Sequence, residues 1–158
     1  MTEYPLKTVV KVRHVPPPFR GVGRGTFYTR KLHRGDLLLT DIGPCWYNCW
    51  RHEAGFQVRD TANRTTAYDL EGTLMYLVNA GDSAEGAVWP VGYTRSQQRK
   101  TTLAWRPNAE YTTVLRRTTG RRTTGRRKRW YLLALRLIRD VLPEDQLLAQ
   151  NYMVGNQH

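Results

Sequence analysis

The order of apolar and polar positions predicts a chain built mainly from short strands. Residues 7–15, KTVVKVRHV, are rich in β-branched side chains and partly alternating, which is typical of a strand. Further strands are expected at Thr26–Thr29, Leu37–Leu39 and Glu110–Arg117. Residues 130–138, WYLLALRLI, fit either a buried strand or a helix, because they carry no polar alternation.

The remaining stretches predict one short helix and long connections. Asp69–Asn79 carries apolar residues at helical spacing, although Gly72 weakens the helix. Residues 51–67 are polar and show no clear period. Residues 81–107 are polar and punctuated by glycine and proline, and connections of that length are usually functional or disordered. We therefore expect an insertion at about 81–107.

Length and charge narrow the class of protein. A chain of 158 residues with 40% apolar content suits one compact globular domain. The net charge of +12 favours acidic partners, above all nucleic acid. No apolar run reaches the ~18 residues that a membrane span needs, and the first ten residues carry no apolar secretory core. We expect an intracellular protein without a membrane partner.

The positive charge is concentrated between two predicted strands. A tandem RRTTG repeat over residues 116–125 leads into GRRKR, and the flanking strands predict an elongated hairpin with a tip at about 118–128. Eight basic residues lie there without an acidic one, which leaves +4 for the rest of the chain. These eight are Arg116, Arg117, Arg121, Arg122, Arg126, Arg127, Lys128 and Arg129.

Three interpretations of this arginine run stay open. Paired arginines make bidentate, salt-sensitive contacts with a phosphate backbone. A cluster such as GRRKR also serves as a nuclear import signal, and a charged hairpin tip can simply be solvated. Because no base-reading motif accompanies the run, contact with nucleic acid is expected to be independent of sequence.

The cysteine content bears on metal binding. Cys45, Cys49 and His52 lie close together, but Cys-x3-Cys-x2-His lacks a fourth ligand. Two cysteines build neither a disulfide framework nor a four-cysteine zinc site, and buried free cysteines are commoner than either. We therefore expect no metal site.

A glycine loop, GVGRG at residues 21–25, leads into the strand expected at Thr26–Thr29. A dinucleotide-binding fingerprint needs its glycines to open a helix, so this loop is of another kind. Glycines allow positive φ or a close approach of the backbone to a ligand. The loop is therefore either a tight turn or the backbone wall of a binding site.

Four segments, in this order, resemble the SET domain, the fold of S-adenosylmethionine-dependent protein-lysine methyltransferases. They are GVGRGTFYTRKLHRGDLLLTDIG at 21–43, GTLMYLVNAG at 72–81, RPNAEY at 106–111 and IRDVLPEDQLLAQNY at 138–152. The resemblance implies a single domain over residues 1–158. Its fold would be mainly β with short helices (α+β), with several small sheets around a knotted C-terminal segment.

The chain departs from the family pattern at four places. Tyr76 stands for the usual arginine, Ala80 for the usual histidine and Glu144 for the usual glycine. Tyr152 lies one residue later than the family's closing tyrosine, an offset that a bulge would absorb.

The resemblance implies S-adenosylmethionine as cofactor and methyl transfer to a lysine of a protein substrate, on a histone or another basic tail. Gly23, Arg24 and Gly25 would present backbone groups to the methionine end of the cofactor. Asn79 would hydrogen-bond the cofactor through its side chain and backbone, and Ala80 through its backbone alone. From the residues by themselves, Asn79 also fits a plain helix C-cap.

The resemblance also implies a catalytic role for Tyr152, whose hydroxyl would be aimed at the reacting amine; the other interpretation is an aromatic residue packed on the core. The alternative function is a catalytically inactive SET-like module that binds nucleic acid or a protein partner through the arginine-rich hairpin. The missing histidine and the displaced tyrosine favour this alternative, whereas the glycine loop and Asn79 favour the enzyme. The enzyme would act in chromatin, and the protein is expected in the nucleus.

Overall fold

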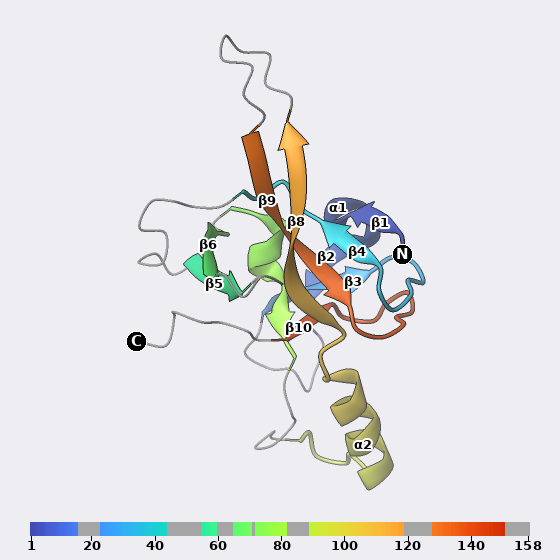
Figure 1. Cartoon of the computed structure of the whole chain (residues 1–158). Coiled ribbons are helices and arrows are strands. Elements are labelled where there is room, and N and C mark those ends of the chain that lie inside the picture. The colour runs from blue at the N-terminus through green and yellow to red at the C-terminus, as the bar shows by residue number, and fades with distance from the viewer. Residues whose placement is uncertain are drawn as a thin grey trace.

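The strands of the residues that the structure describes form one large and two small sheets (Figure 1). The computed structural model describes residues 1–15, 23–43, 55–59, 65–70, 72–81, 89–118 and 128–150. Its few helices are short. The predicted class, mainly β with short helices and several sheets, is confirmed. The predicted knot involves residues 151–158, which lie outside the described ranges.

The large sheet joins strands from both ends of the chain. Its order is β1 (Glu3–Pro5), β4 (Leu37–Leu39), β9 (Lys128–Leu137), β8 (Ala109–Thr118), β10 (Leu148–Gln150) and β7 (Asn79–Ala80). The β4–β9 and β8–β9 pairs are antiparallel, and the other three pairs are parallel. β10 lies between β7 and β8 in the sheet. The C-terminal strand is therefore inserted between two strands from the middle of the sequence.

The long β8–β9 hairpin forms the centre of this sheet. Its pairing runs from Ala109↔Leu137 to Thr118↔Lys128, so the strand alternative for residues 130–138 is right. Residues 133–135 of β9 are all fully buried. A strand covered on both faces reads as a continuous apolar run, which explains why this segment shows no alternation.

The first predicted strand is wrong in its N-terminal half. Residues 7–15 contain the end of α1 (Leu6–Val9), and β2 (Val10–His14) begins only after it. Leu6 and Val9 are both buried, and a spacing of three places them on one face of a helical turn. Burial of this pair under the sheets therefore outweighs the β-propensity of the segment.

The predicted helix over Asp69–Asn79 is reduced to a single 3-10 turn, η2 (Leu74–Leu77). Gly72 has φ +74°, a left-handed conformation that interrupts a right-handed helix. The segment before it belongs to β6 (Thr65–Asp69), which pairs with β5 (Gly55–Arg59). The stretch at 51–67 thus contains most of a hairpin that its irregular polar pattern did not predict.

Part of the expected insertion is a helix, α2 (Arg95–Ala104), and the long-loop interpretation is wrong there. Thr94 caps it: its Oγ1 accepts from the backbone N–H of Gln97 at 3.1 Å, and Gln97 Oε1 accepts from the N–H of Thr94 at 2.8 Å. This reciprocal capping box was a readable signal of a helix start. No residue of α2 is buried, and the helix projects away from the sheets (Figure 1).

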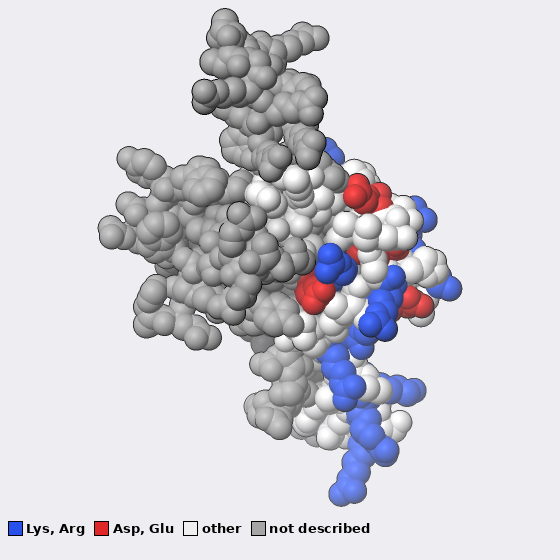
Figure 2. All heavy atoms as spheres, viewed as in Figure 1, with Lys and Arg blue, Asp and Glu red and all other residues white. Residues whose placement is uncertain are grey.

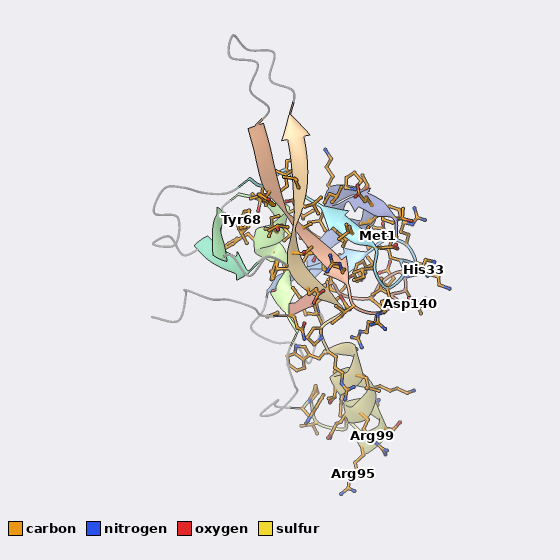
Figure 3. All side chains as sticks on the ribbon, viewed as in Figure 1. Met1, His33, Tyr68, Arg95, Arg99 and Asp140 are labelled. Atoms are coloured by element: carbon orange, nitrogen blue, oxygen red, sulfur yellow. The ribbon has the colours of Figure 1, made fainter. Side chains whose placement is uncertain are left out.

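The hydrophobic core lies between the sheets and draws on all three of them. Tyr28 from β3 (Arg24–Tyr28), Tyr68 from β6 and Leu133 from β9 are each fully buried. The hydroxyl of Tyr68 donates to the carbonyl of Tyr131 at 3.0 Å, so this side chain ties the small β5–β6 sheet to β9 (Figure 3). Among the described helices, none has both the length and the apolar character that crossing a bilayer requires.

Candidate functional site

Asn79 lies against the start of β3, although the two segments are far apart in sequence. Its Nδ2 donates to the carbonyl oxygen of Arg24 at 3.2 Å and to Oε1 of Gln146 at 2.9 Å. A carbonyl oxygen only accepts, so the orientation of this amide is set. Both protons of Nδ2 are used, which leaves Oδ1 as the side-chain atom that can accept from a ligand. The glycine segment and the asparagine thus lie together.

The three residues of the Gly-x-Gly segment differ in their surroundings. Gly23 is exposed, has φ +72° and faces open space where a Cβ would be. Gly25 is buried, and a Cβ there would lie 2.5 Å from Gln146 Oε1 and 2.8 Å from Asn79 Nδ2. Only glycine fits at position 25 without moving the two amides. Ala80 is exposed beside Asn79 in β7.

Gln146, for which the sequence pattern predicts no role, connects this cluster to the core. It forms an isolated antiparallel bridge with Phe27, two residues beyond Gly25 on the same strand. Its carbonyl oxygen accepts from Nδ2 of Asn108 at 2.8 Å. In the sequence, Asn108 and Gln146 are marked only by their positions in the third and fourth SET-like segments. These positions do not predict that the two residues are in contact.

Asn108 is a buried hydrogen-bonding centre. Its Oδ1 accepts from the hydroxyl of Tyr28 at 2.7 Å and from the N–H of Leu148 at 3.2 Å. Its backbone N–H donates to Leu148 and its carbonyl accepts from Ile138, each at 2.9 Å. One side chain therefore links β3, β10 and the segment that carries Gln146.

The environment of Tyr28 keeps its hydroxyl protonated. Burial raises the pKa of Tyr28 well above its ordinary value of 10.0. The negative charge of Asp145 raises this pKa further, and the positive charge of Arg139 lowers it. Tyr28 is therefore a hydrogen-bond donor to Asn108 at neutral pH and not a proton-transfer group.

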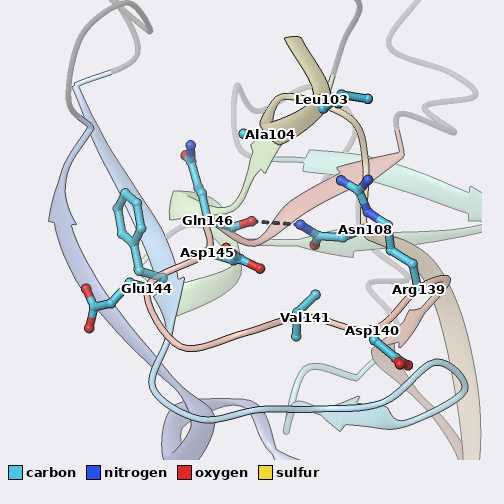
Figure 4. A pocket seen from close by; sticks show the side chains of 10 residues that line it. Leu103, Ala104, Asn108, Arg139, Asp140, Val141, Glu144, Asp145 and Gln146 are labelled. Carbon is cyan, nitrogen blue, oxygen red and sulfur yellow. Dashed lines mark hydrogen bonds between the residues drawn. The ribbon is translucent and has the colours of Figure 1, made fainter. Parts of the chain in front are cut away.

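A cavity of about 410 Å³ borders the cluster (Figure 4). Its lining includes Phe27 and Gln146 and, from the end of α2, Leu103 and Ala104. Gln146 belongs to both features, since its side chain also accepts from Asn79. The volume falls within the range of small-molecule sites.

Glu144, on the rim of this cavity, has a left-handed backbone with φ +76°. The SET-like pattern has glycine at this position, and glycine is the residue that adopts such a conformation without strain. The exposed carboxylate of Glu144 pairs with Lys11 and Arg13, each at 2.7 Å. The hydrogen bond from Lys11 is the main reason why the pKa of Glu144 is lowered, and the charge of Arg13 adds to it.

The structure does not describe several of the residues predicted from sequence, and it places others away from the cluster. Tyr152, Cys45, Cys49 and His52 lie outside the described ranges, as do Arg121, Arg122, Arg126 and Arg127. The backbones of Arg116, Arg117, Lys128 and Arg129 lie at the far end of the β8–β9 pairing. Arg116 is seven residues along β8 from the end that pairs with β10, or about 23 Å. Within the described ranges, no three His, Cys, Asp or Glu side chains gather as metal ligands do.

Comparison with known proteins gives a likeness in fold and none in sequence family. No protein-family model and no curated protein matches the sequence. Among solved structures, the chain is similar to the SET domain of the RIZ1 tumor suppressor (PRDM2), with 13% sequence identity and a TM-score of 0.42. The similarity covers 91% of this chain and 72% of that chain. At such identity the likeness concerns the fold alone.

Proposed function

We propose that this chain binds S-adenosylmethionine at the cluster of Gly23, Arg24, Gly25, Asn79 and Ala80, and transfers its methyl group to a protein lysine. The observation that carries the proposal is the hydrogen bond from Asn79 to the Arg24 carbonyl at 3.2 Å. Two segments that resemble the SET pattern independently, and that lie 55 residues apart, meet at this bond.

The chemistry of the cluster supports a ligand with positively charged donors. Asn79 offers Oδ1 as an acceptor, and the Arg24 carbonyl has a second lone pair beyond the one that Asn79 uses. Gly23 faces open space, so a ligand can approach its backbone closely. These groups would hold the ammonium and sulfonium end of the cofactor, and Ala80 would add only its backbone.

A second support is the backbone of Glu144. The resemblance aligns this residue with a glycine, and its φ of +76° is a conformation that favours glycine. The alignment of the closing segment therefore agrees with the geometry at a position where the residue itself departs from the pattern. Tyr152, in the same segment, remains the predicted group beside the reacting amine.

When bound, S-adenosylmethionine would supply a methyl carbon that a neutral lysine amine attacks. A C–N bond would form while the C–S bond breaks, with its electron pair staying on sulfur. The amine proton would leave to solvent. The residues of the cluster would bind and orient the reactants, which is worth several kcal/mol in a displacement of this kind. Tyr152 would orient the amine through its hydroxyl.

Calorimetric titration of S-adenosylmethionine tests the site. We expect binding by the unchanged chain and at least tenfold weaker binding by Asn79→Ala, since one hydrogen bond to a charged group contributes about 1.5–3 kcal/mol. Asn79→Asp keeps an acceptor oxygen but loses the Nδ2 donor to the Arg24 carbonyl, so it is also expected to bind more weakly than the unchanged chain. Gln97→Ala removes a carboxamide from the α2 cap and is the control that leaves affinity unchanged. Absence of binding by the unchanged chain would refute the proposal.

Methyl transfer is tested separately, with a labelled methyl group and lysine-bearing histone-tail peptides against the same peptides with arginine in place of lysine. Label in the lysine peptides alone, lost in Tyr152→Phe, is the expected result. Binding of the cofactor without transfer to any of these peptides would instead favour the inactive SET-like module.

A further inference from the structure

The positive charge of the chain has a second concentration, on and just after α2. Arg95, Arg99, Lys100 and Arg106 lie within residues 94–107, which contain no acidic residue. The arginine run at 116–129 accounts for eight of the twelve net charges, and these four account for the rest. The remainder of the chain is therefore neutral, with as many acidic as basic residues.

These four side chains point into solvent. Arg95, Arg99, Lys100 and Arg106 are all exposed, and among the described residues none of them forms an ion pair with a carboxylate. Figure 2 shows their blue atoms gathered over α2, where no red atom is drawn. In Figure 3, Arg95 and Arg99 lie on the part of α2 that projects farthest from the sheets.

α2 contributes no buried residue to the hydrophobic core. A ten-residue helix is marginal by itself, and most helices gain stability by burying an apolar face. No residue of α2 is buried, although Leu103 and Ala104 at its end line the cavity, and a capping box of Thr94 and Gln97 closes its N-terminus. The chain thus maintains a basic helix that mostly faces solvent, which is expected of an element that contacts a partner.

The arrangement of the charges suits a regular anionic surface. Arg95 and Arg99 are four residues apart, so they share one helix face and are separated by about 6 Å along the axis. Lys100 follows at about 100° around the helix. At the base of the helix, Nη2 of Arg139 donates to the carbonyl of Arg106 at 2.7 Å and holds that end against the domain.

We propose that α2 and Arg106 bind the phosphate backbone of nucleic acid without reading its sequence. Docking of a helix in the groove of a protein partner requires an apolar stripe, and the basic part of α2 has none. The basic residues are interspersed with Ser96, Gln97 and Thr101, whose hydroxyl and amide groups also bond phosphate oxygens. The proposal does not depend on the proposed methyl transfer.

This surface is distinct from the arginine run. α2 precedes the start of β8, whereas the run follows the other end of that strand. Removing charge from α2 therefore leaves the charge of the run in place.

The test compares two variants of the full chain that lose the same charge. In the first, Arg95, Arg99 and Lys100 are changed to Gln, which keeps a high helix propensity. In the control, Lys7, Lys31 and Arg34, which are exposed elsewhere, are changed to Gln. Binding to a labelled DNA duplex and to an RNA duplex of equal length is measured by anisotropy over a series of salt concentrations, with polyglutamate as competitor.

We expect the α2 variant to flatten the slope of log K against log salt by about 2–3, one for each lost phosphate contact, and the control by less than 1. Arg95→Lys with Arg99→Lys keeps the charge and should keep the slope. Flattening with both duplexes supports backbone contact in general, and flattening with one alone identifies which duplex is bound. Equal slopes for the α2 variant and the control would overturn the proposal. Competition by polyglutamate as strong as that by unlabelled duplex would also overturn it, because the partner would then be an acidic protein.

Discussion

The hydroxyl of Tyr28 donates to Oδ1 of Asn108 at 2.7 Å, between two side chains that are both buried. Tyr28 ends β3, and Asn108 comes immediately before β8. Asn108 also bonds Gln146, which in turn accepts from Asn79 in the candidate site. The core hydrogen bond and the candidate site therefore belong to one network of polar side chains.

We predict strong coupling between these two residues. Tyr28→Phe removes one donor and should lower the free energy of unfolding by about 1–2 kcal/mol. Asn108→Ala leaves the Tyr28 hydroxyl, the Leu148 N–H and the Gln146 carbonyl without this partner and should cost about 3–5 kcal/mol. In the double variant the orphaned hydroxyl is gone, so its cost should be below the sum of the two. Urea unfolding measures all three, and strictly additive values would contradict the network.

The raised pKa of Tyr28 predicts a loss of stability at alkaline pH. The unfolded chain releases this proton near pH 10, whereas the folded chain holds it to higher pH. The stabilisation is complete below pH 10.0 and is lost as the pH rises above it. Melting temperatures measured across this range should fall less steeply for Tyr28→Phe than for the unchanged chain, and parallel curves would show that Tyr28 does not contribute.

Gly25→Ala should disturb the candidate site more than Gly23→Ala. The new Cβ at position 25 would lie 2.5 Å from Gln146 Oε1, so Gln146 must rotate and give up its bond to Asn79. We expect a cost of about 1–3 kcal/mol and weaker binding of S-adenosylmethionine. At Gly23 the cost is that of a left-handed alanine alone, about 1–2 kcal/mol.

The control for this prediction is Gln146→Ala, which removes the nearest clashing atom. Adding it to Gly25→Ala should recover part of the lost stability, though not the affinity for the cofactor. If the double variant is as unstable as the sum of the single ones, the clash involves Asn79 or Val15, which lie next nearest to that Cβ.

Replacing Glu144 separates backbone strain from charge. Glu144→Gly removes a side chain from a left-handed residue, whereas Glu144→Gln keeps that conformation and loses the ion pairs with Lys11 and Arg13. We expect the glycine variant to melt above the glutamine variant at neutral pH, because exposed ion pairs contribute little. The reverse order would show that charge matters more than backbone conformation here.

The same residue predicts a response to acid. The pKa of Glu144 is lowered in the folded chain, so the stabilisation is present above the ordinary value of 4.5 and is lost as the pH falls below it. The gap in melting temperature between the unchanged chain and Glu144→Gln should close on acidification. A gap that persists well below that pH would assign the difference to packing.

Thr94→Ala should loosen α2 without unfolding the domain. Loss of an N-cap costs about 1 kcal/mol, which corresponds to about fivefold faster amide exchange in the helix. Because no residue of α2 is buried, we expect global stability to stay unchanged. Hydrogen exchange resolved by residue, with a thermal melt beside it, measures both. A lowered melting temperature would mean that α2 supports the core.

Local patterns determined much of this protein. The β-branched and apolar runs predicted β4 and β8, because the alternation and burial of side chains along a strand are visible in the sequence, whereas the segment of β9 fitted a strand or a helix equally well. The order of the SET-like segments led to Asn79 and the Gly-x-Gly loop, and the structure places these together. The excess of arginine was equally visible, since charge is a property of composition.

Only the tertiary structure decided the rest, because it depends on contacts between remote segments. The helical turn at Leu6–Val9 follows from burial under the sheets, which outweighs local β-propensity. The requirement for glycine at position 25 exists only because Gln146 and Asn79 approach it from elsewhere in the chain. Likewise, the three basic residues of α2 and Arg106 form one exposed surface only because the helix projects away from the sheets. The local sequence does not predict that orientation.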